Sequence, residues 1–464
     1  MKLWSNWWKL ISTLRPAFSR VQTFNWFVLS LIAFSVREDL NGVTSFVRAL
    51  GLKPSCYECL LHFFHSDAVK LDKLSQLWLA TVLKFFPVVF KDGKPIAILD
   101  GVKNPKEGKK MPAVKYLHQG SGSNSKPEFV MGHSFQSFGI LCCVRGYHFC
   151  VPVCALIHEG LVFSNRDKKT LIDKAGSMLV DIFGKDQKFL LLADAYYANG
   201  KMLKSLTALG SILISRVRTN AVAYEKADIP TQKKRGRPQL YGTKIKLSEL
   251  FNSALFKELT CNLYGEKVRV EYLCKDLVWK PFGKVIRFVL VKHPGRGRMI
   301  LMCSDLSTSP VEMIRLYSFR FKIEVTFKHA IRNIGVFGYH FWMAEMTPLK
   351  QKNGNQYLHK KTEGYRNQVM RKIKAYHSFV QVGLIAQGML QYLSMTQTKH
   401  VWKHFGSWIR TIRPGILPSE AIVSKALWNT LPYFLKGSIT GGIIEKFITS
   451  RIDRKRSESM RFAG

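Results

Sequence analysis

Two short apolar runs that each end in an aspartate constrain the fold of this chain most. They occupy residues 96–100, ending in Asp100, and 189–194, ending in Asp194. Continuous apolar runs of this length are typical of strands that are buried on both faces. Two further strand-like runs and a helical segment lie between them, at 138–144, 147–157 and 168–183. Strands that alternate with helices indicate an α/β layer fold.

The rest of the chain divides by periodicity and charge. Apolar residues recur at helical spacing near the N-terminus, while short alternating or apolar runs surround a basic loop further on. From residue 350 the sequence holds 20 Lys+Arg against 5 Asp+Glu. We therefore expect a helical N-terminal region (1–90), the first part of an α/β core (91–215), a β-rich insertion (216–305), the second part of the core (306–395) and a basic C-terminal region (396–464).

The charge balance points to an anionic partner. The chain has 71 Lys+Arg against 31 Asp+Glu, a formal net charge of +40. A folded protein this basic repels itself unless an anion offsets the charge; nucleic acid is the commonest such partner, and an anionic membrane surface is second. The apolar stretch 24–36 is too short for a membrane span. Nine cysteines, an odd number, favour a reducing compartment, so we expect an intracellular protein without a membrane segment.

A third acid, Glu324, stands among cations. Ser309 is a suitable N-cap for a predicted helix that continues past Glu324. Four residues at spacings of three, four and four share one face of this helix: Tyr317, Arg320, Glu324 and Lys328. Three carboxylates at one site can hold two Mg²⁺ ions that drive displacement at phosphorus. The alternative is that the two aspartates cap loops and Glu324 forms surface ion pairs.

The region around Glu324 resembles a family signature. The pattern Tyr317-x-x-Arg320-x-x-x-Glu324 is similar to the Tyr-Arg-Glu-Lys signature of bacterial insertion-sequence transposases of the Asp-Asp-Glu type. The lead-in 304–307, the β-rich insertion before Glu324 and the stretch after Asp100 that leads to 130–135 also resemble that group. The resemblance covers roughly residues 40–395. It departs at position 331, where the family's Lys is replaced by Ile331.

The resemblance implies a fold and an activity. It implies an RNase H-like catalytic core, interrupted by the β-rich insertion, in a DNA transposase that cleaves transposon ends and joins them to target DNA. Asp100, Asp194 and Glu324 would be the catalytic residues and would hold two Mg²⁺ ions, for which Mn²⁺ can substitute. The implied partner is DNA, both terminal inverted repeats and target, bound by a homodimer in the bacterial cytoplasm at the nucleoid.

Two alternatives stay open. One is an RNase H-like nuclease that does not transpose. The other is a non-catalytic DNA-binding protein, a decayed transposase, which the Ile331 departure keeps open. Joining of a cut DNA end to a target separates a transposase from a nuclease, and metal-dependent nicking separates both from a binding protein.

Several residues outside the acid set are candidate DNA contacts. Lys328 or Arg332 would replace the missing signature cation, and we favour Lys328. Trp279 would stack on a flipped base if the resemblance extends to it, although core packing is the simpler interpretation. Arg235-Gly-Arg237-Pro resembles an AT-hook core, with a solvated basic loop as the alternative. The full set is Tyr317, Arg320, Lys328, Arg332, Arg235, Arg237 and Trp279.

Two other motifs favour structural roles. Cys56, Cys59, His62 and His65 follow one another at steps of three inside an apolar helical pattern. Zinc sites instead join a Cys pair to a distant His pair, so this spacing favours helix packing. His133 lies in a strand-like run and is predicted to be a buried, hydrogen-bonded histidine.

Overall fold

The computed structural model describes residues 2–120, 127–227, 239–410 and 412–455, which form a mixed α/β fold with thirteen α-helices in these ranges. The chain forms two compact units. The first consists of Met1–Val88, Gly101–Lys168 and Glu324–Gly464, and the second of Val89–Asp100 and Lys169–Ile323. The chain therefore leaves the second unit directly after Asp100 and again directly before Glu324.

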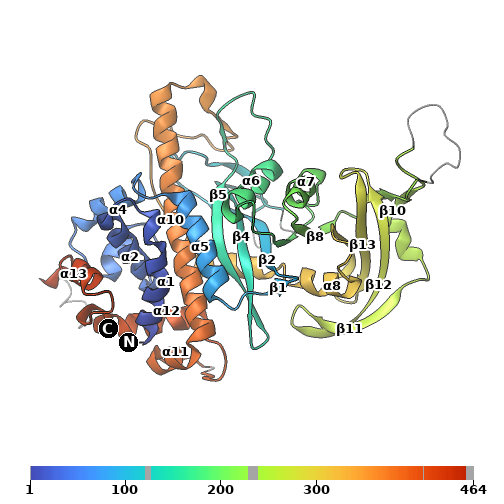
Figure 1. The fold of residues 1–464 in the computed structure, drawn as a ribbon. Coiled ribbons are helices and arrows are strands. Elements are labelled where there is room, and N and C mark those ends of the chain that lie inside the picture. The colour runs from blue at the N-terminus through green and yellow to red at the C-terminus, as the bar shows by residue number, and fades with distance from the viewer. Residues whose placement is uncertain (1, 121–126, 228–238, 411, 456–464) are drawn as a thin grey trace. The chain divides into compact units, whose positions relative to one another are not determined.

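The first unit is built around the helix α10 (Glu363–Thr396), which runs beside α2 (Val21–Val36) and α5 (Leu71–Phe85) (Figure 1). Almost every residue of α2 is buried, because this helix is apolar on all sides and must lie inside the unit. None of the helices in the described ranges is long and apolar enough to cross a membrane. The other helices of this unit are α1 (Lys2–Ile11), α3 (Thr44–Ala49), α4 (Cys56–Phe64), α9 (Lys322–His329, shared with the second unit at its start), α11 (Thr398–Phe405), α12 (Glu420–Lys436) and α13 (Ile443–Thr449).

A long antiparallel hairpin covers α10 in the same unit. It consists of β4 (Phe129–Val144) and β5 (Tyr147–Ile157), with β3 (Lys115–His118) paired to the outer part of β4. The buried Gln381 amide of α10 donates to the carbonyl of Val153 at 2.8 Å, which fixes the helix on β5. Both strands predicted in this region are present, and β4 begins nine residues earlier than its apolar run because its first part pairs with β3.

The strands of the second unit belong to one mixed sheet, which has a parallel part and an antiparallel part. The first part of β2 (Lys94–Pro105), β7 (Leu190–Ala193) and β8 (Ile212–Val217) run parallel, with α6 and α7 as connections. The predicted helix is α6 (Leu171–Phe183), whose N-terminus carries a capping box made by Thr170 and Asp173. The remaining elements are α7 (Gly200–Ala208), β9 (Val222–Tyr224), β10 (Lys244–Lys246), β11 (Lys257–Leu263), β12 (Glu266–Trp279), β13 (Lys284–His293), β14 (Gly297–Cys303) and α8 (Pro310–Ser318).

The antiparallel strands match the β-rich character predicted for residues 216–305. From β8 the strand order runs β14, β13, β12, β9 and β10, with β11 on the other part of β12 (Figure 1). The described residues between β8 and α8 contain strands and a short 3₁₀ turn but no α-helix. That this segment is an insertion into an RNase H-like core stays a prediction.

The prediction of one continuous helix through Glu324 is wrong. Ser309 does cap α8, since its hydroxyl accepts from the backbone N–H of Glu312 at 3.2 Å, but α8 ends at Ser318. The N–H groups of Phe319 and Arg320 bond to carbonyls three residues back, at 3.0 Å each, and this tighter turn ends the α-helix. A second helix, α9, starts at Lys322 and passes into a π-helical turn, Ala330–Ile334. Tyr317 and Glu324 therefore lie on different helices, and Lys328 and Arg332 are not one regular α-helical turn apart.

Candidate active site

The register of two parallel strands brings Asp100 and Asp194 together. In the pairing of β2 with β7, Leu99 lies opposite Ala193, so the residue after each is an aspartate at the same level. Asp194 directly follows the last residue of β7, whereas β2 continues past Asp100 to Pro105, so the prediction that Asp100 ends its strand is wrong. The pairing of β2 with β7 nevertheless stops at Leu99, directly before Asp100. Asp100 and Asp194 therefore lie at neighbouring positions of the two strands, and both are partly buried.

Each aspartate is held by a polar partner. The Arg320 guanidinium donates to Oδ2 of Asp100 at 3.0 Å, and both side chains are less than one-fifth exposed. The backbone N–H of Tyr196 donates to Oδ1 of Asp194 at 2.9 Å, and the Ser215 hydroxyl donates to the Asp194 carbonyl at 2.7 Å. A charge-assisted bond from arginine stabilises the carboxylate form of Asp100. Arg320, predicted to contact DNA, thus lies on a candidate catalytic acid in this structure.

Two tyrosines lie within electrostatic reach of the acids. Burial, and next the charges of Asp100 and Asp194, raise the pKa of Tyr197 well above its usual value. Burial likewise raises the pKa of Tyr317 to about 12. Both phenols are therefore neutral near pH 7 and can donate a hydrogen bond. Tyr197 was not among the predicted site residues, although it follows Asp194 by three positions.

Arginines from separate segments of the second unit gather around Tyr264: Arg216 of β8, Arg296 of the β13–β14 turn and Arg320 of the turn between α8 and α9. The Arg296 guanidinium lies 3.6 Å from the centre of the Tyr264 ring. Burial raises the pKa of Tyr264, and the charges of Arg296, Arg320 and Arg216 oppose that rise. Arg216 and Arg296 are thus near Arg320 although they lie far from it in sequence. No local motif marks them, so sequence reasoning did not find them.

Glu324 lies in α9, at the start of the third stretch of the first unit. Glu324 and Lys328 are both exposed on this helix, while Thr326 and Phe327 are buried between them. The approach of Glu324 to the two aspartates stays a prediction. Within the described residues, no group of three or more His, Cys, Asp or Glu side chains is close enough together to hold a metal ion.

A buried polar network anchors α9 from beneath. The Thr326 hydroxyl donates to the Cys150 carbonyl at 2.7 Å, and the Gln387 amide donates to the Thr326 carbonyl at 2.9 Å. His329 bonds through Nδ1 to the carboxylate of Glu420, the first residue of α12. The hydrogen bond to Glu420 is the main cause that raises the pKa of His329. The segment predicted only as a basic tail therefore helps to hold the helix that carries Glu324.

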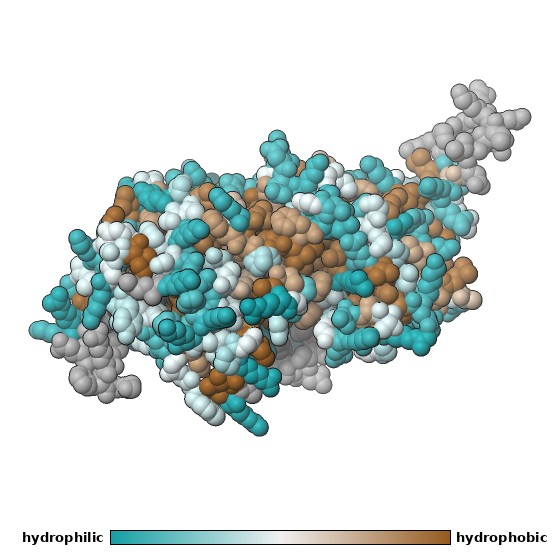
Figure 2. All heavy atoms as spheres, turned by 60° about the horizontal axis from the view of Figure 1, so that its bottom comes forward, coloured by the Kyte–Doolittle hydropathy of each residue, from teal (hydrophilic) through white to brown (hydrophobic). Residues whose placement is uncertain are grey.

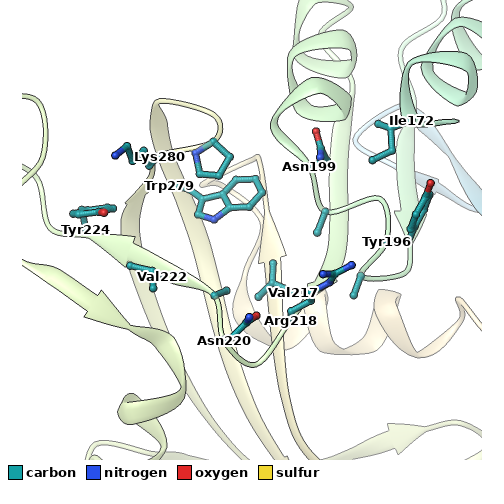
Figure 3. Close-up of a pocket in the computed structure, with 14 residues that line it drawn as sticks. Ile172, Tyr196, Asn199, Val217, Arg218, Asn220, Val222, Tyr224, Trp279 and Lys280 are labelled. Atoms are coloured by element: carbon teal, nitrogen blue, oxygen red, sulfur yellow. The ribbon is translucent and has the colours of Figure 1, made fainter. Parts of the chain in front are cut away.

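Trp279 lines a pocket in the second unit. The pocket measures about 640 Å³, and Figure 3 shows the Trp279 indole on one side of it with Asn199 and Tyr196 on the other. Trp279 ends β12 and is only 6% exposed, so it packs in the unit and also forms a wall of the pocket. Because Ala195 and Tyr196 directly follow Asp194, the pocket begins next to the acid pair. Its polar and charged lining residues are Tyr196, Asn199, Arg218, Asn220, Tyr224 and Lys280.

The other motifs are structural in the described residues, or lie outside them. Cys56 is buried in α4 while Cys59 is exposed, as expected for a packed helix. His133 is fully buried and bonds to the Tyr339 hydroxyl at 2.6 Å and the Pro112 carbonyl at 2.8 Å, which confirms a buried, hydrogen-bonded histidine. Burial lowers the pKa of His133 to about 3, so the ring is neutral. Arg235 and Arg237 lie outside the described residues.

The α/β fold and the acid pair agree with the protein family whose sequence pattern this chain matches. Residues 13–254, which are 242 of the 464 residues, match the family described as DDE superfamily endonuclease. Since the match spans more than half of the chain, the protein belongs to that family. The matched region contains Asp100 and Asp194 and ends before Glu324. No curated protein matches the chain.

Proposed function

We propose that this protein is a DNA transposase that cleaves transposon ends and joins them to target DNA. The observation that supports this most is the in-register pairing of β2 and β7, which sets Asp100 and Asp194 at neighbouring positions. Family membership supports phosphodiester chemistry, and the Tyr-Arg-Glu pattern supports transposition in particular. We take the parallel strands as the centre of an RNase H-like core and Glu324 as the third acid.

The donor chemistry of the site fits a hard divalent cation. Asp100 and Asp194 offer carboxylate oxygens only, which are the ligands that Mg²⁺ prefers and Mn²⁺ also accepts. Asp100, Asp194 and Glu324 would hold the ions. Bound there, two ions would supply a Lewis acid for the phosphate and activate a water or 3′-hydroxyl.

The chain's own residues would bind and orient the DNA. Arg320 has to share Asp100 with an incoming cation, so its guanidinium becomes available to a phosphate oxygen, with bidentate geometry. The neutral phenols of Tyr197 and Tyr317 can donate to phosphate oxygens without adding charge. Lys328, exposed one turn after Glu324, would supply the signature's missing cation, with Arg332 as a weaker contributor.

The Trp279 pocket would receive a base near the cleaved end. Its aromatic side chains offer stacking faces, and Arg218 and Lys280 can bind the adjoining phosphates. The remaining features of the proposal rest on the family resemblance: terminal inverted repeats as substrate, a homodimer that holds two ends, and a bacterial nucleoid location.

Strand transfer tests this proposal against a plain nuclease. The purified protein is incubated with Mg²⁺, a duplex that ends in the element's terminal repeat and a supercoiled target plasmid. A transposase joins the 3′-end of the duplex to the plasmid, which sequencing across the junction detects. Metal-dependent nicking without any joined product would instead favour the nuclease, the function that the family description names.

A further inference from the structure

Two acid-poor segments of the first unit lie against each other. Residues 1–37 contain no Asp or Glu, and residues 398–437 contain only Glu420. The helices α1, α11 and α12, which these segments form, pack together (Figure 1). Glu420 is 6% exposed and accepts a hydrogen bond from the Gln391 amide at 2.8 Å, so its charge is turned into the core. The charged side chains that these two segments expose are therefore all cations.

The cations of this surface lie on α11 and at the end of α12, whose last residue is Lys436. Lys399 and Lys403 are exposed and four residues apart on α11. Burial, and next the charges of Lys2 and Lys403, lower the pKa of His400. Lys425, in the first half of α12, is excluded because it pairs with Glu38 at 3.7 Å.

A hollow of about 460 Å³ lies between the two helices. His404, Thr430, Tyr433, Lys436 and Gly437 line it, and Tyr433 is 67% exposed. In Figure 2 the bottom of Figure 1, where α11 lies, is turned toward the viewer. Hydrophilic side chains lie there with apolar ones between them. Together these side chains form the α11–α12 surface, which consists of Lys399, His400, Lys403, His404, Tyr433 and Lys436.

The chemistry of this surface fits a phosphate backbone better than a lipid bilayer. Clustered cations without exposed acids repel one another, and an anionic polymer offsets that repulsion. A helix that lies in a membrane surface presents an apolar face to the acyl chains. The apolar residues Val401 and Phe405 of α11 are instead buried in the protein, and the exposed residues of this helix are Lys399 and Lys403. Tyr433, beside Lys436, adds a ring on which a base can stack.

We propose that the α11–α12 surface binds the phosphate backbone of nucleic acid, as a contact separate from the acid pair. Nothing in this inference requires cleavage chemistry, so it can hold or fail independently of the proposed function. Truncation cannot test it, because removing the chain after residue 350 would remove α10, the centre of the first unit.

Lysine substitution in the full chain tests the proposal. The variant Lys399→Ala/Lys403→Ala/Lys436→Ala and the parent are titrated against a labelled mixed-sequence DNA duplex by fluorescence anisotropy, without divalent metal, over a range of salt. Each phosphate contact contributes about 0.9 to the slope of log K against log[salt]. We expect the slope to fall by about 2–3 and the affinity at low salt to fall by about tenfold or more.

A charge-matched variant provides the control. Lys73→Ala/Lys185→Ala/Lys267→Ala also removes three exposed lysines, each next to an acid in the sequence, and should keep nearly the parental slope. Circular dichroism checks that each variant is folded, and Lys403→Ala alone replaces the triple variant if it is not. An unchanged slope in the α11–α12 variant overturns the proposal. The proposal is also overturned if the variant loses binding to phosphatidylserine vesicles but keeps its binding to DNA, because the partner would then be a membrane. A protein that binds DNA with a steep slope but never cleaves it would refute the proposed function alone.

Discussion

At the scale of single residues, the candidate site consists of the two aspartates and the side chains around them. Asp100 and Asp194 could be proposed from sequence because each directly follows a buried apolar run, and these runs pair in register as parallel strands, although β2 itself continues to Pro105. Arg216 and Arg296 could not, because their proximity to Tyr264 depends on how segments far apart in the sequence pack. Tyr197 is only three positions from Asp194, but no sequence motif marks it. The Arg320–Asp100 bond was equally hidden, since the sequence places the two residues 220 positions apart.

The missing signature lysine leads to a prediction at this scale. Lys328→Ala should slow end cleavage by about tenfold, because a phosphate contact near the cleaved end is lost, whereas metal affinity should not change. Arg332→Ala, in the π-helical turn, should have less effect. Cleavage rates of both variants on one end-sequence duplex provide the measurement. Parental rates for Lys328→Ala would place the contact elsewhere.

At the scale of elements, the break between α8 and α9 marks where sequence reasoning failed. The spacing of Tyr317, Arg320 and Glu324 fits an α-helix, but spacing cannot show that the backbone changes to three-residue hydrogen bonds at Phe319. The C-terminal region was read from its charge, which does not reveal which helices are buried. The structure shows that α12 holds α9 through Glu420.

The buried carboxylate of Glu420 gives a stability prediction. Glu420→Ala would leave the Gln391 amide and His329 without their acceptor, and an unsatisfied buried donor costs about 1–3 kcal/mol. The unfolding free energy of the protein should fall by at least that much in urea titrations. Glu363→Ala, at an exposed first turn of α10, is the control and should change it by less than about 0.5 kcal/mol. Equal effects of the two changes would argue against the anchoring role.

The same pair predicts a dependence on pH. Because the bond to Glu420 raises the pKa of His329 in the folded state, the charged pair stabilises the fold fully below the unfolded value of about 6.5. That contribution is lost as the pH rises through the raised folded pKa. The thermal midpoint of the parent should therefore fall more between about pH 6 and pH 8 than that of His329→Asn. The same fall in both proteins would show that His329 is not the titrating group.

At the scale of the whole molecule, the proposed function gives the charge of +40 and the acid pair separate roles. The exposed cations would attract DNA over long range, and Asp100 and Asp194 would carry out the chemistry on it. Composition alone indicated nucleic acid as the partner class. It could not indicate that the acid-poor segments of the two chain ends meet on one surface, because that depends on the packing of α1 against α11 and α12.

Metal-dependent nicking of end-containing plasmid DNA tests the central claim most directly. Asp100→Asn and Asp194→Asn each remove an anionic oxygen ligand at nearly constant shape, and Asp186→Asn changes an exposed acid of the same unit as the control. We predict that both site variants bind DNA like the parent but nick it at least about 100-fold more slowly with Mg²⁺, while Asp186→Asn nicks at the parental rate. Parental nicking by Asp194→Asn would contradict the assignment of the acid pair as the catalytic site.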